Sequence, residues 1–125
     1  MKILLVEDNL LNQKVVIFNL RKFNYEVITV TNGFDAINKF KSDSPDLILM
    51  DIMLPEMNGF KTTVKIRKIE KEKGSSKQVP IIALTANTLD NDKEKCIKAG
   101  MNDFLAKPFT VRELNHIIDK YLRKD

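Results

Sequence analysis

The sequence contains little cysteine and no long apolar run. Its 125 residues include a single cysteine, Cys96, so a disulfide framework is excluded and this thiol is expected to pack as a small core side chain. No apolar segment approaches the roughly 20 residues that span a membrane, and the N-terminus does not resemble a signal peptide. These absences predict a cytoplasmic domain without direct membrane contact.

Histidine is equally scarce, and neither sign of charge dominates. The only histidine, His116, falls at an exposed-looking position of the last predicted helix, and its solitude argues against a histidine kinase. The 21 basic and 17 acidic residues give a net charge of +4, but the two signs are interleaved along the chain. Interleaved charges are typical of solvated helix faces rather than of a nucleic-acid footprint. No direct contact with nucleic acid is therefore predicted.

The chain does contain a regular alternation of short apolar runs and helical patterns. With 43% hydrophobic and 30% charged residues, it fits one globular domain spanning residues 1–125. No internal repeat, linker or low-complexity tract interrupts the alternation. Strands are predicted at residues 2–6, 25–30, 47–50, 79–84 and 102–106, and helices at about residues 10–23, 34–41, 59–73, 89–99 and 110–123.

This alternation predicts an α/β fold. The four consecutive apolar residues at 47–50 indicate a strand covered on both faces, which is typical of a parallel sheet beneath helices. Repeated strand–helix units imply such a sheet with helices on both of its faces. Five units of this length fit the flavodoxin-like doubly wound arrangement, (βα)5, with strand order 2-1-3-4-5. The alternating, β-branched run at 25–30 suggests a strand near an edge.

Polar residues follow several of the predicted strands. Glu7 and Asp8 follow the first strand and Asp51 follows the third, while Thr85 and Lys107 end the fourth and fifth. All strands of a parallel sheet run the same way, so these side chains are expected at one edge, where such folds bind ligands. A lone aspartate would more simply solvate the end of its strand. A functional site is suggested because several acidic, hydroxyl and amine groups are expected at the same edge of the sheet.

The three carboxylates expected at this edge would repel one another, and they need a cation or bound protons at neutral pH. Oxygen ligands without histidine or cysteine select a hard cation, and Mg²⁺ is the cation predicted. A carboxylate beside Mg²⁺, a lysine and a hydroxyl suits phosphoryl transfer, because aspartate can accept a phosphoryl group covalently.

These motifs resemble the receiver domain of bacterial response regulators. The resemblance is carried by E-D-N at 7–9, D-I-M-L-P-E-M-N-G at 51–59, T-A at 85–86 and K-P-F at 107–109, and it covers essentially the whole chain. It implies a phosphorylatable switch of a two-component or phosphorelay system. Such a domain catalyses its own phosphorylation from a phosphohistidine donor, and its own dephosphorylation.

The resemblance also implies a role for individual residues. Asp51 is the implied phosphoacceptor, and Lys107 would pair with the phosphoryl group. Thr85 and Phe104 are the implied switch residues, although many members of the family carry tyrosine in place of this phenylalanine. A cis peptide bond between Lys107 and Pro108 is implied as well. Mg²⁺ would be held by carboxylates and one main-chain carbonyl, namely Glu7, Asp8, Asp51 and the carbonyl of Met53.

Three longer motifs are similar to receivers fused to hybrid sensor histidine kinases. They are E-D-N-x-x-N-Q at 7–13, A-L-T-A-N at 83–87 and C-x-x-A-G-M-N-D at 96–103. Such receivers pass the phosphoryl group to a histidine phosphotransfer protein, so the implied partners are a histidine kinase, a phosphotransfer protein, or both. A free-standing regulator and a domain of a longer chain both fit. A monomer is expected, with a transient dimer as the alternative.

The first predicted helix carries two apolar stripes, only one of which must face the sheet. One stripe consists of Val16, Leu20 and Phe23. A second stripe is more often core than docking surface, but this one begins one turn after Asp8, at the rim of the site. It consists of Leu11, Val15 and Phe18. The surface predicted to meet a phosphotransfer partner comprises Leu11, Asn12, Val15 and Pro108.

Two alternatives stay open at this point. A phosphatase of the haloacid dehalogenase kind also uses a strand-end aspartate, but it carries a second aspartate two residues on, where this chain has Met53. A degenerate receiver that acts only as a binding module usually lacks one of the acidic pair, the acceptor or the lysine. All of these residues are present here.

Overall fold

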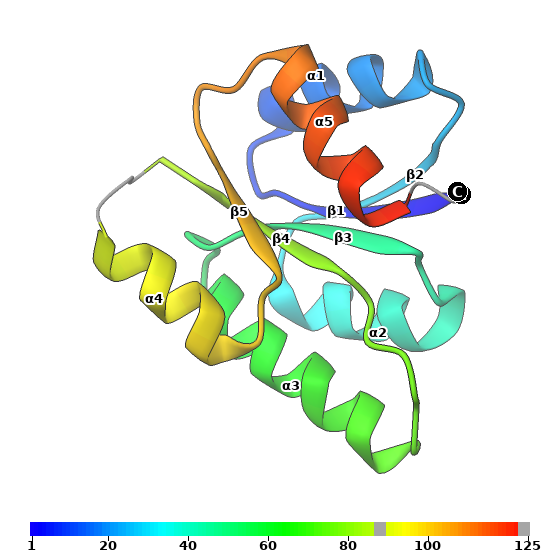
Figure 1. The fold of residues 1–125 in the computed structure, drawn as a ribbon, viewed down its shortest axis with the longest axis vertical. Coiled ribbons are helices and arrows are strands. Elements are labelled where there is room, and N and C mark those ends of the chain that lie inside the picture. The colour runs from blue at the N-terminus through cyan, green and yellow to red at the C-terminus, as the bar shows by residue number, and fades with distance from the viewer. Residues whose placement is uncertain (87–89, 123–125) are drawn as a thin grey trace.

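Strands and helices alternate throughout residues 1–86 and 90–122, which the computed structural model describes without the side chains of residues 90–92 (Figure 1). The strands are β1 (Lys2–Val6), β2 (Glu26–Val30), β3 (Leu47–Asp51), β4 (Ile81–Thr85) and β5 (Asp103–Ala106). The helices are α1 (Leu10–Arg21), α2 (Gly33–Asp43), α3 (Gly59–Glu72), α4 (Asp90–Ala99) and α5 (Val111–Leu122). The predicted helix ends at Leu89 and Arg123 lie outside the described residues, as does Asn87.

The strands form one parallel sheet in the order β2-β1-β3-β4-β5, with β2 at an edge as predicted. Helices α1 and α5 cover one face of the sheet, and α2, α3 and α4 cover the other (Figure 1). The predicted doubly wound, flavodoxin-like fold is therefore confirmed. The carboxyl ends of β1 and β3 lie side by side, because Val6 pairs with Met50. This is the place where the strand order reverses.

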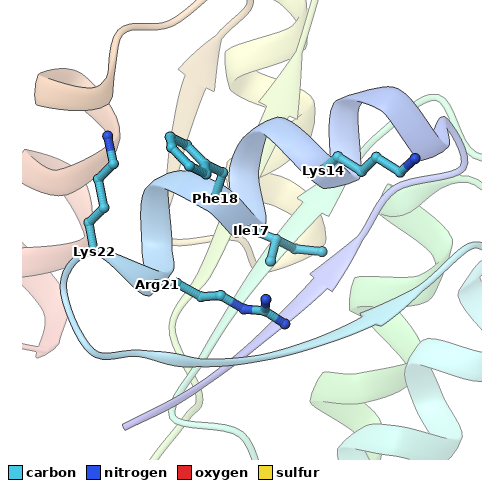
Figure 2. A pocket seen from close by; sticks show the side chains of 5 residues that line it. All are labelled: Lys14, Ile17, Phe18, Arg21 and Lys22. Atoms are coloured by element: carbon cyan, nitrogen blue, oxygen red, sulfur yellow. The ribbon is translucent and has the colours of Figure 1, made fainter.

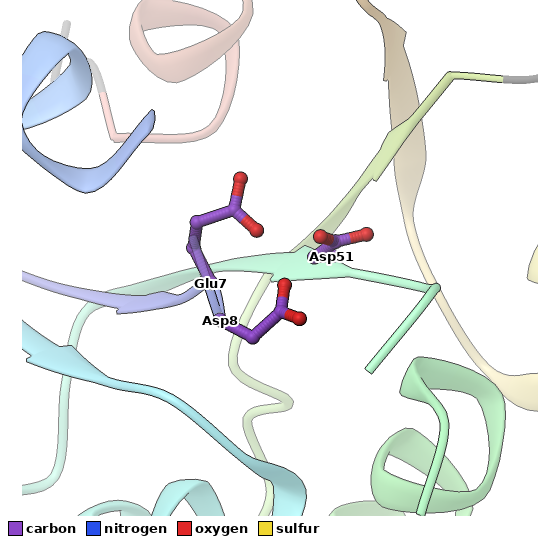
Figure 3. Close-up of side chains that lie close together, drawn as sticks. All are labelled: Glu7, Asp8 and Asp51. Atoms are coloured by element: carbon purple, nitrogen blue, oxygen red, sulfur yellow. The ribbon is translucent and has the colours of Figure 1, made fainter. Parts of the chain in front are cut away.

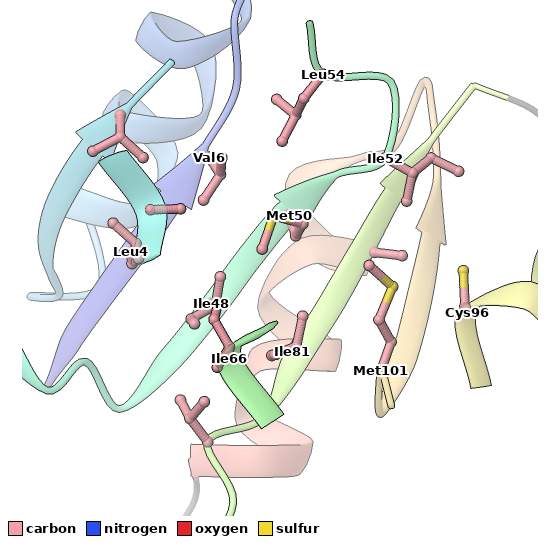
Figure 4. Packing of buried hydrophobic residues seen from close by; sticks show 14 residues of the cluster. Leu4, Val6, Ile48, Met50, Ile52, Leu54, Ile66, Ile81, Cys96 and Met101 are labelled. Atoms are coloured by element: carbon pink, nitrogen blue, oxygen red, sulfur yellow. The ribbon is translucent and has the colours of Figure 1, made fainter. Parts of the chain in front are cut away.

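Alternate side chains of the strands contribute to two cores, one on each face of the sheet. In β1, Ile3 and Leu5 belong to the core beneath α1 and α5, whereas Leu4 and Val6 belong to the opposite core. All five residues of β3 are buried, as expected for a strand covered on both faces. Figure 4 shows the core that contains Leu4, in which Cys96 packs among apolar side chains as predicted.

Two predicted positions are wrong for identifiable reasons. The first helix was predicted to continue to about Phe23, but α1 ends at Arg21 and Phe23 is 40% exposed. The chain leaves the helix through Asn24, whose φ of 65° is left-handed. The fourth strand begins at Ile81 rather than at residue 79, because Pro80 has no N–H to donate to the ladder.

Two predicted helix-end motifs are present. The N–H of Thr110 donates to Glu113 Oε1 and the N–H of Glu113 donates to Thr110 Oγ1, each at 3.0 Å, which is a reciprocal capping box at the start of α5. Gly100 ends α4 with a φ of 103°, a conformation that favours glycine. The following N–H, that of Met101, donates to the carbonyl of Cys96 at 2.9 Å. These caps fix both ends of the segment that carries β5.

Candidate functional site

Three carboxylates meet at the carboxyl edge of the sheet. The pairing of β1 with β3 places Glu7 and Asp8 beside Asp51, and one oxygen from each residue lies within 4.8 Å of the others (Figure 3). Glu7 and Asp51 are buried, whereas Asp8 is exposed. Among the described residues, no hydrogen bond or ion pair holds the carboxylate of Asp8. The structure therefore brings together the three acids that the strand ends suggested.

Lys107 reaches the same point from the end of β5. Its Nζ lies 2.9 Å from Glu7 Oε1 and 3.5 Å from Asp51 Oδ2. The other oxygen of Asp51, Oδ1, accepts a hydrogen bond of 2.9 Å from the N–H of Met53. Lys107 also donates its backbone N–H to the carbonyl of Thr85 at 2.7 Å. The Lys107–Pro108 peptide bond is cis, as the family resemblance implied.

Burial and charge shift the pKa values of this cluster. Burial raises the pKa of Glu7, and the adjacent Asp51 carboxylate raises it further, while the Lys107 ammonium acts in the opposite direction. Burial alone would lower the pKa of Lys107, but its hydrogen bond to Glu7 and the charges of Asp51 and Glu7 outweigh burial, so the pKa is raised. One ammonium thus partly neutralises a site that carries three acids.

The donor set fits a hard divalent cation. Glu7 Oε2 is buried and has no hydrogen-bond partner among the described residues, although a buried carboxylate oxygen normally has one. A cation bound between Glu7, Asp8 and Asp51 would satisfy this oxygen and the excess negative charge together. All three side chains offer oxygen ligands, which Mg²⁺ and Ca²⁺ prefer.

The predicted switch residues lie on strands next to this cluster. Thr85 is buried at the end of β4. Phe104 lies in β5 opposite Ala83 and is partly buried against the core. The Nζ atom of Lys93, on α4, lies 5.6 Å from the centroid of the Phe104 ring. The aromatic side chain therefore connects α4 with β5, the strand that Lys107 follows directly.

Three of the four predicted partner-binding residues, all except Leu11, line a groove beside the carboxylate cluster. Asn12, Val15 and Pro108 line a groove of about 400 Å³ together with Glu7 and Lys107. Val16, Leu84 and Phe109 contribute apolar side chains to the lining of the groove. This groove reaches the carboxylate cluster, because Glu7 and Lys107 are among its lining residues.

The second apolar stripe of α1 is a surface and not part of the core. Leu11 is 71% exposed and Val15 is 53% exposed, and Phe18 is exposed as well. Further along α1, the ring of Phe18 packs with Lys22, whose Nζ lies 4.4 Å from the ring centroid. Figure 2 shows the hollow around Phe18, which Lys14, Ile17, Arg21 and Lys22 complete.

One buried polar residue near the site had no role in the sequence interpretation. Gln13 lies in α1 and its side-chain amide is buried, with Nε2 2.7 Å from the carbonyl oxygen of Glu7. The only signal for it was its membership of the E-D-N-x-x-N-Q motif, because a helical glutamine is more often exposed. By contrast, His116 is exposed as expected. None of the helices in the described residues is long and apolar enough to cross a membrane.

Comparison with known proteins identifies relatives over nearly the whole chain. The family model of the response regulator receiver domain matches residues 3–119. Hybrid signal transduction histidine kinase B of Dictyostelium discoideum is 45% identical over 97% of this chain. That match covers 7% of the kinase, so the chain spans a small part of the curated relatives it matches.

Solved structures of receiver domains also match this chain over nearly its whole length. The receiver domain of sensor histidine kinase PA1611 from Pseudomonas aeruginosa is 45% identical and superposes with a TM-score of 0.87, covering 98% of both chains. That structure has a magnesium ion coordinated in its active site cleft. A chain of the Saccharomyces cerevisiae co-crystal structure of the histidine phosphotransfer protein Ypd1 with the receiver domain of Ssk1 is 35% identical. Its TM-score is 0.89, and the match covers 97% of this chain and 88% of that chain.

Proposed function

The chain belongs to the response regulator receiver domain family, and we propose that it is the phosphoacceptor switch of a two-component or phosphorelay system, with Asp51 as the acceptor. The observation that carries this proposal is the position of the Asp51 carboxylate. It is buried at the end of β3, 3.5 Å from the Lys107 ammonium and within 4.8 Å of two further carboxylates. A nucleophilic oxygen, a cationic partner and a set of metal ligands therefore share one small volume.

The proposed reaction transfers a phosphoryl group from phosphohistidine. A carboxylate oxygen of Asp51 forms a bond to phosphorus as the bond from phosphorus to the donor's imidazole nitrogen breaks. The imidazole keeps the electron pair of that bond and takes up a proton. Lys107 is placed to pair with the phosphoryl oxygens, because its Nζ already lies beside the acceptor carboxylate.

We propose Mg²⁺ as the cation of this site. Its ligands would be the carboxylates of Glu7, Asp8 and Asp51 and the main-chain carbonyl of Met53. When bound, Mg²⁺ supplies neutralising charge for the phosphoryl oxygens. The magnesium ion in the cleft of the related PA1611 receiver supports this choice, as does the unpartnered buried oxygen of Glu7.

The proposed conformational switch is driven by the added negative charge when Asp51 is phosphorylated. Phosphorylation of Asp51 replaces a carboxylate with a more negative group that has three acceptor oxygens. Thr85 ends the neighbouring strand and Lys107 faces the acceptor, so both are positioned to respond. We propose that Phe104 passes this response to the surface formed by α4, β5 and α5.

The proposed partners are a histidine kinase and a histidine phosphotransfer protein, which meet the chain at Leu11, Asn12, Val15 and Pro108. The hybrid kinases among the relatives support the first partner, and the co-crystal with Ypd1 supports the second. The groove lined by Val15, Pro108 and Lys107 supports docking there. We place the domain in the cytoplasm, as a monomer that can dimerise transiently. The chain has a single cysteine, the buried Cys96, and this is compatible with that reducing compartment.

Val15→Asp tests the docking surface. Val15 is 53% exposed, so a carboxylate there is solvated and the fold should be kept. We expect transfer from a phosphorylated histidine phosphotransfer protein to slow at least about tenfold, because a buried apolar contact with the partner is lost. Labelling by acetyl phosphate should be unchanged. Val64→Asp is the matched control, since Val64 is 52% exposed on α3 and away from the groove. Equal loss of both activities in Val15→Asp would contradict docking at α1.

Gly59→Ala tests how tightly the acceptor is held. A Cβ atom on Gly59 would lie 2.6 Å from the carbonyl oxygen of Asp51 and 2.8 Å from Ile52 Cα. Both are backbone atoms, so the loop after β3 must shift. We expect a loss of about 1–2 kcal/mol in the free energy of unfolding and labelling by acetyl phosphate about tenfold slower.

Gly74→Ala is the control for this stability loss. Gly74 has a φ of +67° and no neighbouring atom within 4 Å, so its substitution costs about 1 kcal/mol through backbone strain alone. Labelling of this variant should proceed at the wild-type rate. Urea denaturation and the time course of labelling measure both quantities. If Gly59→Ala is labelled at the wild-type rate, the close approach of residue 59 to the Asp51 backbone does not position the acceptor.

A further inference from the structure

Asp8 is the proposed metal ligand with the least support from side chains. It is exposed, and within the described part of the chain its carboxylate accepts no hydrogen bond and forms no ion pair. Glu7 is held by Lys107, and Asp51 is held by Lys107 and by the N–H of Met53. The position of the Asp8 carboxylate therefore depends on the backbone that carries it.

Gln13 of α1 forms hydrogen bonds with the backbone on both sides of Asp8. The side-chain Nε2 of Gln13 donates to the carbonyl oxygen of Glu7 at 2.7 Å. The backbone N–H of Gln13 donates to the carbonyl oxygen of Asn9 at 3.0 Å. Glu7 and Asn9 flank Asp8 directly, so Gln13 closes a loop around the exposed ligand. Asn9 is fixed further as the N-cap of α1, where its side chain accepts from the N–H of Asn12 at 2.9 Å.

The amide of Gln13 also connects this loop to the sheet. Its Nε2 lies 3.4 Å from the carbonyl oxygen of Val30, at the end of β2. The same carbonyl accepts the N–H of Glu7 at 3.1 Å. Two N–H groups of one buried amide thus face two carbonyl groups, and an apolar side chain of the same length satisfies neither. The contact to Glu7 is the shorter one.

We infer that Gln13 is a positioning residue for the divalent cation: its buried side-chain amide holds the Glu7–Asn9 backbone so that Asp8 and Glu7 present their carboxylates together. This inference rests on the proposed function, because it concerns the same Mg²⁺ site. It adds a residue that touches neither the cation nor the phosphoryl group. Gln13 also joins the site to α1, the helix proposed to meet the partner.

Gln13→Met tests the inference, because methionine has a similar length and no donor. We expect Mg²⁺ binding, measured by calorimetry without any phosphodonor, to weaken about tenfold, as is typical when a supporting residue of a metal site is removed. The Mg²⁺ concentration for half-maximal labelling by acetyl phosphate should rise by the same factor. The labelling rate at saturating Mg²⁺ should stay within about twofold of wild type, since the acceptor and Lys107 are untouched.

Tyr121→Phe is the matched control. The hydroxyl oxygen of Tyr121 lies 3.0 Å from Asp103 Oδ2 and 3.1 Å from the carbonyl oxygen of Asn102, either of which can accept its hydrogen, at the opposite end of the sheet. Its loss should leave Mg²⁺ affinity unchanged. Unchanged affinity in Gln13→Met, or an equal loss in both variants, would overturn the inference. Absence of Mg²⁺ binding by the wild-type chain would overturn the proposed function as well, so the two failures are distinguishable.

A measurement on the wild-type chain decides the question if Gln13→Met does not fold. In a nitrogen-15 NMR spectrum, the side-chain amide of Gln13 should exchange its hydrogens slowly with water, because it is buried against two carbonyl groups. Its resonances should shift when Mg²⁺ is added, while those of Gln78, an exposed glutamine, should not. A Gln13 amide that exchanges freely and does not respond to Mg²⁺ would overturn the inference.

Discussion

Asp51→Asn should take up no phosphoryl group from acetyl phosphate in the presence of Mg²⁺, whereas the wild-type chain should approach one group per molecule. An amide oxygen is a far weaker nucleophile than a carboxylate oxygen, and no second acceptor lies in the same position. The nearby acids Glu7 and Asp8 are expected to bind the cation rather than the phosphorus. Labelling with radioactive acetyl phosphate, or the mass of the intact protein, measures the stoichiometry.

Asp46→Asn is a control on the same strand-bearing segment. Asp46 precedes β3, at the end opposite Asp51, and its Oδ2 accepts a hydrogen bond of 2.7 Å from the N–H of Lys2. This variant should be labelled like the wild type. Stoichiometric labelling of Asp51→Asn would sink the assignment of the acceptor. Many turnovers of phosphate release from a generic phosphate monoester would instead favour the phosphatase alternative, which needs a general acid where Met53 stands.

The meeting of the acidic residues and Lys107 at one edge could be predicted because all strands of a parallel sheet run in the same direction. Once the runs ending at residues 6 and 50 are taken as parallel neighbours, Glu7 and Asp51 must meet, and the register of Val6 with Met50 bears this out. Lys107 follows for the same reason from the last strand. The chemistry of the edge thus depends on which residue types end each strand, and these can be read directly from the sequence.

The surroundings of the site could not be predicted in the same way. Helix α1 has apolar residues on two sides, so periodicity does not decide between the stripe with Val16 and the stripe with Val15. Packing against the sheet decides it, and Val15 is left in solvent. Gln13 was also missed, because its burial depends on carbonyl groups of β1 and β2 that are distant in sequence.

The burial of a charged residue in α3 could not be predicted from the sequence either. The interleaving of its charged residues predicted a solvated face, but Glu70 is buried. Its Oε1 accepts from Arg67 Nη1 at 2.8 Å, and its Oε2 accepts from the N–H of Val79 at 2.7 Å. Val79 lies just before β4, where Pro80 prevents a regular ladder, so the carboxylate supplies the partner that the sheet does not. A local sequence pattern contains no information on such a partner.

Lys107→Met should destabilise the chain strongly without Mg²⁺ and much less with it. Lys107 is the only cation among the described residues that forms an ion pair with Glu7 or Asp51, and Glu7 is buried. Its removal leaves a buried carboxylate without its charged partner, which we expect to lower the free energy of unfolding by about 2–3 kcal/mol. Mg²⁺ at about 100 times its dissociation constant from the variant should return about 2.7 kcal/mol, because it binds the folded form. The deficit relative to wild type should shrink because Lys107 no longer competes with the cation for Glu7 and Asp51, so that Mg²⁺ binds the variant more tightly than wild type. Thermal and urea denaturation with and without Mg²⁺ measure both.

Lys120→Met is the matched control, since it removes an equivalent but exposed ion pair. Lys120 Nζ lies 3.2 Å from Asp103 Oδ2, and its side chain is 59% exposed. Exposed pairs of this kind contribute about 0–1 kcal/mol, so this variant should lose little stability and show no added dependence on Mg²⁺. Equal losses in both variants, or a loss in Lys107→Met that Mg²⁺ does not reverse, would contradict the arrangement of charges proposed here.

The pH dependence of Lys107→Met follows from Glu7. Burial already raises the pKa of Glu7 in the folded chain, and loss of the ammonium that lowers this pKa must raise it further. Between the ordinary value of 4.5 and the raised value, the folded chain then binds more protons than the unfolded chain. Stability conferred by protonated Glu7 is therefore complete at low pH and is lost as the pH rises through the raised pKa. The deficit of Lys107→Met relative to wild type should shrink as the solution is acidified through this range, and a deficit that grows on acidification would show that the variant fails for a reason other than an unpaired carboxylate.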